Sequence, residues 1–241
     1  MKFLKAHWKH LLLVNYRVAP ELLERYVPAK TALDFFQGDC YVSLVAFLFD
    51  QTRVLGIPVP GHRCFEEVNL RFYVTPNRDR SLRAVTFLQE IVPRAAIPWI
   101  ANSLFHEHYV AMPMGHEFVW REPSDKDDPQ KAPQRVTYTW GAQQGNRISA
   151  RIDNALKLPP QGSLGEFITE HYWGYAKGPK RTLEYRVEHP PWVSCSVEDI
   201  EMQVDFRGSY GEEFAFLESE KPASVLYARG SGVSVSFPSI L

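Results

Sequence analysis

The chain has 241 residues, of which 45% are hydrophobic and 23% are charged, and its formal net charge is −1. This is the composition of an ordinary globular protein that can bury a sizeable core without disulfide staples. Lys and Arg are spread along the sequence, which argues against the basic stripe of a nucleic-acid-binding protein, so we expect no nucleic-acid partner.

The three cysteines, Cys40, Cys64 and Cys195, lie far apart and form no CxxC pair. An odd number without close spacing indicates reduced thiols in a cytosolic protein, and we interpret all three as small buried hydrophobic residues. The apolar run at 11–14 is too short for a signal peptide, and no apolar segment approaches the roughly 20 residues that span a bilayer. We therefore expect a cytoplasmic protein with no membrane partner.

Predicted strands dominate the first part of the chain. The run 11–16 favours a buried strand, and 20–28 favours a short helix because one proline lies in its first turn and another ends it. The apolar, aromatic-rich run 40–49 predicts a strand buried on both faces. The stretches 64–74 and 82–92 predict a hairpin joined by the turn sequence TPNRDR.

The clearest longer helix is predicted over 98–108, followed by a pair of strands within 109–122. A hairpin is expected over 135–153 because of its glycine-containing turn. Ser163 and Glu166 have the spacing of a capping box and predict a short helix. The remaining stretches predict strands, with RGSG at 229–232 interpreted as a hairpin turn; these stretches are 181–189, 199–206 and 224–237.

The expected architecture is mainly β with a few short α helices. Many strands and no alternation of strand and helix favour one mostly antiparallel sheet system. A barrel or a highly curved sheet removes exposed edges at this chain length. We expect residues 1–241 to form a single domain.

A row of polar side chains marks the strand CFEEVNLRFYV (64–74). Residues two apart on a strand point the same way, so Glu67, Asn69 and Arg71 form a row of carboxylate, amide and guanidinium opposite an apolar face. Such a row is either the solvent-facing side of a strand or the wall of a cavity. Asn is disfavoured on strands, which favours the cavity wall, where its amide has a specific partner.

The histidines of His106-Glu107-His108, together with His116, raise the question of a metal site, because two His and one carboxylate can bind zinc or iron. The sequence has no HExxH spacing, and surface or hydrogen-bonded histidines are commoner. It also contains no GxGxxG, P-loop or G-x-S-x-G motif. We therefore expect no metal and no cofactor.

Several stretches resemble a known family. GIPVPGHRCFEEVNLRFYV (56–74), FITEHYWGYAK (167–177) and VEHPPW (187–192) resemble the YqjF-like uncharacterised family, which is related to acetoacetate decarboxylase. NYRVAPELLERYVPA (15–29) is similar to the N-terminal region of acetoacetate decarboxylases. The resemblance implies a conical antiparallel β-barrel with an internal cavity. In the decarboxylase, a lysine forms a Schiff base with a β-keto acid, beside an arginine and two glutamates.

The resemblance carries over only in part. Glu67 matches one active-site glutamate. Lys9 stands at the arginine position, where it keeps the positive charge but lacks the planar guanidinium group. The second glutamate is expected on strand 40–49, which has none, only Tyr41 or Ser43 near that position. Tyr109 stands about where the lysine would be.

No lysine occurs between Lys30 and Lys126. Schiff-base chemistry needs an amine, so we expect no imine with acetoacetate and no acetoacetate decarboxylase activity.

The leading hypothesis is a barrel that binds a small carbonyl- or carboxylate-bearing metabolite. Lys9, Asn69 and Arg71 are the candidate ligand-binding residues, and an anionic group is expected to pair with the two cations. Glu67 is a candidate acid or base and Tyr109 a candidate hydrogen-bond donor or proton carrier.

Alternatives remain open. One is a lyase, hydratase or aldolase that uses acid–base groups without Schiff-base chemistry. Others are a non-catalytic ligand-binding or sensor protein, and a structural barrel with a filled core. The sequence leaves homo-oligomer formation open.

Overall fold

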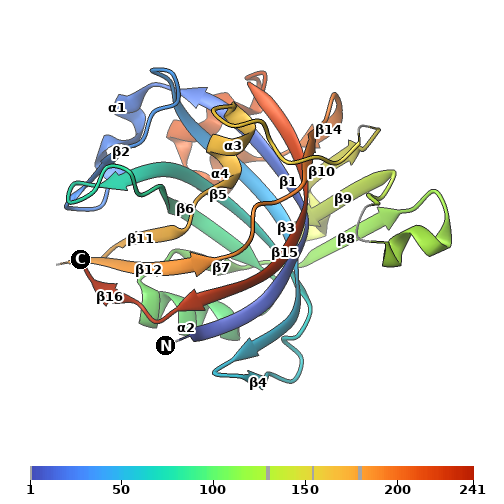
Figure 1. Ribbon diagram of the computed structural model, residues 1–241, viewed down its shortest axis with the longest axis horizontal. Helices are drawn as coiled ribbons and strands as arrows, with labels where there is room; N and C mark the ends of the chain where they lie inside the picture. The colour runs from blue at the N-terminus through green and yellow to red at the C-terminus, as the bar shows by residue number, and fades with distance from the viewer. Residues whose placement is uncertain (1, 129–130, 154, 179–180) are drawn as a thin grey trace.

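The computed structural model describes residues 2–128, 131–153, 155–178 and 181–241 (Figure 1). Its strands are β1 (Lys2–Val18), β2 (Thr31–Leu33), β3 (Cys40–Val54), β4 (Ile57–Pro58), β5 (Phe65–Pro76), β6 (Ala84–Val92), β7 (Tyr109–Ala111), β8 (Met114–Val119), β9 (Arg135–Trp140), β10 (Asn146–Arg151), β11 (Trp173–Lys177), β12 (Thr182–Glu188), β13 (Ser194–Ser196), β14 (Asp199–Gln203), β15 (Ser224–Ser236) and β16 (Ser239–Ile240). The helices are short: α1 (Pro20–Leu23), α2 (Ala96–Phe105), α3 (Leu164–Thr169), α4 (Phe206–Tyr210), and the 3₁₀ helices η1 (Glu24–Tyr26), η2 (Pro123–Asp127), η3 (Ala142–Gln144) and η4 (Glu212–Glu218).

The main sheet closes on itself. Its strands follow the order β15-β1-β3-β5-β6-β11-β12, and β12 pairs again with β15 through Val187 and Val235. This confirms the mainly β architecture with short helices. The pairing is mostly antiparallel, as expected, and β6 pairs in parallel with both β7 and β11. Figure 1 shows the long strands β1, β3 and β5 crossing the molecule as a strongly curved layer.

Both faces of the long strands are buried. Along β1, Leu12 and Val14 pack into one hydrophobic core, whereas Leu11 and Leu13 pack into another. The first ten residues of β3 are all buried, as the apolar run 40–49 predicts. The two cores lie on opposite faces because successive side chains of a strand point to opposite sides.

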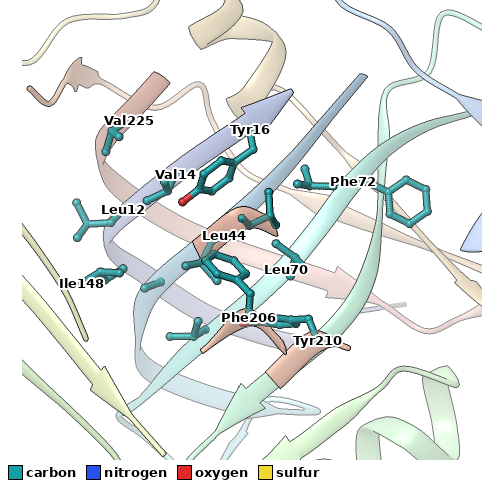
Figure 2. Close-up of a cluster of buried hydrophobic side chains, with 14 of the residues drawn as sticks. Leu12, Val14, Tyr16, Leu44, Leu70, Phe72, Ile148, Phe206, Tyr210 and Val225 are labelled. Atoms are coloured by element: carbon teal, nitrogen blue, oxygen red, sulfur yellow. The ribbon is translucent and has the colours of Figure 1, made fainter. Parts of the chain in front are cut away.

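The first of these cores lies on the outer face of the closed sheet (Figure 2). It is covered by a second, antiparallel sheet of order β14-β10-β9-β8, whose Tyr138, Trp140 and Ile148 are fully buried, and by α4. Phe206 and Tyr210 of α4 pack beside the strand residues in this view. The second core belongs to the inner face, where the candidate site lies.

Three local expectations are wrong. RGSG is not a hairpin turn, because β15 runs through it in register with β1, although Gly230 has a φ of 82°. The strand predicted to end at 206 ends at Gln203, and α4 follows. Cys64 is exposed, whereas Cys40 and Cys195 are buried as expected.

No helix among the described residues is both long enough and apolar enough to cross a lipid bilayer.

Candidate functional site

The polar row of β5 lines a cavity of about 220 Å³ inside the closed sheet. Glu67, Asn69 and Arg71 all face it, and each is less than 10% exposed. The opposite side of β5 carries the apolar residues Val68 and Leu70, which pack into the outer core. Alternation along the strand therefore separates the cavity wall from the packed core.

Glu67 lies at the centre of the polar groups. Its Oε1 accepts a hydrogen bond from the Asn69 amide at 2.9 Å, and its Oε2 accepts one from the Tyr109 hydroxyl at 3.1 Å. Burial raises the pKa of Glu67 to about 7, although both of these hydrogen bonds and the charge of Arg71 act in the opposite direction. The carboxyl group is therefore poised to gain or lose a proton near neutral pH.

The end of α2 brings two further side chains into the cavity. The helix stops at Phe105 because His106 adopts a left-handed conformation with a φ of 57°. The chain then places Glu107, buried, and Tyr109 on the cavity wall. The Asn102 side chain fixes this segment, since it donates to the Tyr109 carbonyl at 3.0 Å and accepts from the Tyr109 amide at 2.8 Å.

Glu90 completes an acidic cluster. It faces Asn69 across the β5–β6 pair and Tyr109 across the β6–β7 pair, so the three residues form one row over three strands. Burial, together with the negative charges of Glu107 and Glu67, raises the pKa of Glu90 well above its ordinary value.

Glu107 also resists ionisation. Burial raises the pKa of Glu107 to about 8, and its Oε1 accepts a hydrogen bond from the Tyr185 hydroxyl at 2.6 Å. The cavity therefore holds three carboxyl groups that cannot all ionise together at neutral pH, because buried like charges oppose one another. Such a cluster can both donate and accept protons.

One end of the cavity carries basic residues that are deeply buried. Arg71 donates from its Nη2 to the Ile168 carbonyl of α3 at 3.1 Å, while its Nε has no hydrogen-bond partner among the described residues. His171 is 6% exposed, lines the same cavity, and has both ring nitrogens unpartnered within the described chain. Buried polar groups normally have partners, so these atoms are suited to hold a polar ligand group.

Burial lowers the pKa of His171 well below its ordinary value, with a smaller effect from the positive charge of Arg71. The imidazole is therefore neutral, and it offers one N–H donor and one acceptor to the cavity.

The structure brings four of the five predicted site residues together: Glu67, Asn69, Arg71 and Tyr109. Lys9 is the exception. Its ammonium group pairs with Asp50 at 2.7 Å, its side chain is 42% exposed, and it is not among the residues that line the cavity.

Sequence reasoning missed several polar residues of the cavity, among them Glu90, Glu107, Tyr185 and His171. A signal existed for Glu90, because the predicted hairpin of 64–74 and 82–92 places it on the strand beside the polar row. Glu107 was considered only within the His106-Glu107-His108 group. Among the described residues, no group of three or more His, Cys, Asp or Glu side chains is arranged to hold a metal ion.

Comparisons with known proteins agree with the fold. The model of the DUF2071 family, described as an uncharacterized conserved protein, matches residues 5–232. The uncharacterized protein YqjF of Bacillus subtilis (strain 168) is 26% identical over 203 residues, which cover 81% of this chain and 76% of that protein.

Two solved structures illustrate the structural likeness. The enduracididine biosynthesis enzyme MppR complexed with pyruvate has a TM-score of 0.66 at 12% identity, over 100% of this chain and 91% of that chain. An acetoacetate decarboxylase-like enzyme from Sphingomonas wittichii RW1 has a TM-score of 0.64 at 14% identity, over 100% of this chain and 94% of that chain. The expected acetoacetate-decarboxylase-like fold is confirmed.

Proposed function

This chain belongs to the DUF2071 family of uncharacterized conserved proteins, and we propose that it binds a small carbonyl- or carboxylate-bearing metabolite inside its closed sheet without forming a Schiff base. The observation that carries this proposal is the convergence of two kinds of group in one cavity. The buried cation Arg71 has an unpartnered N–H, and the Glu67–Tyr109 pair lies on the same wall. A pocket with a few convergent polar groups is the usual form of a small-molecule site.

The anionic part of the ligand pairs with Arg71, whose guanidinium matches a carboxylate in geometry and charge. The neutral His171 supplies an additional hydrogen bond there. The ligand's carbonyl oxygen accepts from the Tyr109 hydroxyl or from a protonated carboxyl group of the acidic cluster. MppR, which shares the fold, has been captured with pyruvate, so this ligand class has a precedent on the scaffold.

Schiff-base chemistry is left out of the proposal because it needs an amine in the cavity. None of the described residues that line the cavity is a lysine, and Tyr109 stands near the position that the decarboxylase resemblance assigns to one. A structural barrel with a filled core is disfavoured by the cavity itself.

Calorimetric titration with pyruvate and with acetoacetate tests the binding proposal. We expect saturable binding of at least one acid, and a loss of roughly 10- to 100-fold in affinity for Arg71→Gln, because a charge-assisted hydrogen bond is removed. Arg80→Gln is the matched control, because Arg80 is an exposed arginine on the turn after β5. The proposal is contradicted if neither acid binds, or if folded Arg71→Gln binds as tightly as the wild type.

A second candidate function is acid–base catalysis on the bound carbonyl compound. The observation that favours it is the pKa of about 7 for Glu67, close to the pH at which a general base works best. In this step the Glu67 carboxylate removes a proton from the carbon beside the carbonyl. The electron pair of the broken C–H bond forms the enolate, and the Tyr109 hydroxyl stabilises the enolate oxygen by donating a hydrogen bond.

Exchange of that carbon-bound proton for deuterium in D₂O, followed by proton NMR, separates an enzyme from a binder. If the protein is catalytic, exchange is accelerated by the wild type and lost in Glu67→Gln, while ligand affinity changes little. Glu117→Gln, an exposed carboxyl on β8, serves as the control. If exchange is no faster with the protein than without it, the catalytic function is contradicted and only the binding function remains.

A further inference from the structure

We infer that the ligand is an oxo acid with an extended apolar tail, bound with its carboxylate at the buried basic end of the cavity and its tail directed along α2 towards the more exposed end. This inference rests on the proposed binding function and adds to it the class of ligand and the direction in which it lies.

Strand register orders the cavity walls from one end to the other. On β3 and β5, Ser43 faces Arg71, Val45 faces Asn69, Phe47 faces Glu67 and Phe49 faces Phe65. Because each pair is two residues further along the strands, the wall changes from guanidinium to amide to carboxylate, and then becomes aromatic. The polar groups thus occupy one part of the cavity and the apolar groups the next part.

The basic part of the cavity is the more deeply buried one, although the lining residues Phe87 and His189 beside it are half-buried. Arg71, Thr169 and His171 are all less than 10% exposed, and α3 covers them with its buried residues Phe167 and Ile168. At the other end, the lining residues Val54, Val59, His62 and Ile97 are half-buried and Ala96 is exposed. A ligand therefore enters past these residues, and its leading group is the one that reaches Arg71.

Aromatic rings form the wall between the acidic cluster and the more exposed end. Trp8 lies 5.1 Å from Phe47 and 5.8 Å from Phe49, measured between ring centroids, and Phe49 stacks on Phe65 at 4.6 Å. Trp192 extends the same wall, 6.1 Å from Trp8. Such a wall contributes to ligand binding by removing apolar ligand surface from water.

Helix α2 forms the opposite wall of this part. Ile97, Ala101 and Phe105 follow one another at four-residue spacing, lie on one face of the helix, and line the cavity. The helix begins at the more exposed end with the exposed Ala96 and ends beside the buried Glu107. At 1.5 Å per residue its length is roughly 15 Å, which is the length of wall available to a tail.

The size of the cavity agrees with such a ligand. Its volume of about 220 Å³ exceeds the roughly 150 Å³ of an engineered apolar cavity that holds a benzene molecule. Pyruvate alone would leave most of the aromatic wall uncovered. Outside the cavity the flanking segments are also apolar, since Ile57 is 68% exposed and Trp99 is 76% exposed, so a tail that emerges still meets apolar surface.

A ligand series with one head group and increasing tail length tests this inference. Pyruvate, 2-oxobutanoate, 2-oxohexanoate and 2-oxooctanoate are titrated against the wild-type chain by calorimetry. We expect affinity to rise by about fourfold for each methylene group that becomes buried. 1-Octanol, which has the tail without the head, is expected to bind at least tenfold more weakly than 2-oxooctanoate, because it lacks the group that pairs with Arg71.

A variant of α2 links the gain in affinity to the proposed wall. Ala101→Leu fills the tail path without lowering helix propensity, and it is expected to reduce the affinity ratio of 2-oxooctanoate to pyruvate by about tenfold. Ser103→Leu is the matched control, because Ser103 is exposed on the same helix and does not line the cavity. This control should leave the ratio unchanged.

The outcomes separate the inference from the function on which it rests. If pyruvate binds but affinity does not rise with tail length, the inference is overturned and the proposed function stands. The inference is also overturned if Ala101→Leu and Ser103→Leu give the same ratio, or if 1-octanol binds as tightly as 2-oxooctanoate. If no member of the series binds, the proposed function itself fails.

Discussion

Glu67 illustrates how burial turns an ordinary carboxyl group into one that titrates near neutrality. Its ordinary pKa is 4.5, and its pKa in the folded chain is about 7. Glu90 and Glu107 are shifted in the same direction for the same reason, removal from water. Each of these shifts means that the folded chain holds protons which the unfolded chain releases at lower pH.

Stability should therefore fall as pH rises through this range. Below pH 4.5 the Glu67 carboxyl is protonated in both states; between pH 4.5 and about 7 only the unfolded chain ionises, which favours unfolding. Above about pH 7 the loss in the free energy of unfolding is complete, and the pKa shift of Glu67 corresponds to a loss of roughly 3 kcal/mol. We expect Glu67→Gln to show a smaller decline than the wild type when the free energy of unfolding is measured with urea between about pH 5 and 8.

Glu117→Gln is the control for that measurement, since the Glu117 side chain is exposed. If the free energy of unfolding declines as much in Glu67→Gln as in the wild type, burial does not raise the pKa of the Glu67 carboxyl.

The site residues were predictable from the local pattern only on a single strand, and Tyr109 was predicted from the family resemblance instead. Alternation in 64–74 identified Glu67, Asn69 and Arg71 without any tertiary knowledge. Glu90 was missed because its place opposite Asn69 depends on the register of the hairpin, which shifts between Leu70 and Arg71.

The positions of Glu107 and His171 in the cavity depend on where the chain leaves a helix. No periodic pattern in the sequence indicates that point. Glu107 follows the left-handed end of α2, and His171 lies two residues beyond the end of α3.

At the scale of elements, apolar runs predicted the strands well, whereas irregular backbone was predicted poorly. The helix expected over 98–108 is Ala96–Phe105, because local sequence does not show that His106 takes a left-handed conformation. RGSG contains two glycines and therefore indicates a turn, but tertiary pairing with β1 keeps β15 continuous through it.

The close approach of Gly230 to β1 leads to a prediction for the stability of β15. A Cβ atom at this position would lie 2.0 Å from the Trp8 carbonyl oxygen, and the backbone has a φ of 82°. We expect Gly230→Ala to lower the free energy of unfolding by about 3 kcal/mol or more, because it adds a backbone clash to an unfavourable conformation. Urea denaturation monitored by circular dichroism measures this.

Gly232→Ala is the control on the same strand, since its Cβ atom would meet nothing closer than the His7 ring at 3.5 Å. It should change stability by less than about 1 kcal/mol. If the two substitutions lower the free energy of unfolding equally, the close approach of Gly230 to β1 does not require a glycine.

At the scale of the whole molecule, closure of the sheet is what places the site. β5 and β6 bring Glu67 and Glu90 into the interior, and β11 and β12 return the chain so that Tyr185 lies opposite them. The sequence predicted mainly β structure and a curved sheet, but the parallel contact of β6 with β11 joins segments far apart in the chain and leaves no local pattern. The single-domain organisation and the cytoplasmic location remain predictions.

The central claim is that the interior of the sheet is a non-covalent site for a carbonyl acid with its head at Arg71. The most direct test is a crystal structure of the wild-type chain grown with 2-oxooctanoate. We expect ligand density in the cavity, with the carboxylate within hydrogen-bonding distance of Arg71, the carbonyl oxygen beside Glu67 and Tyr109, and the tail along α2. An empty cavity, or density continuous with a lysine side chain, would contradict the account.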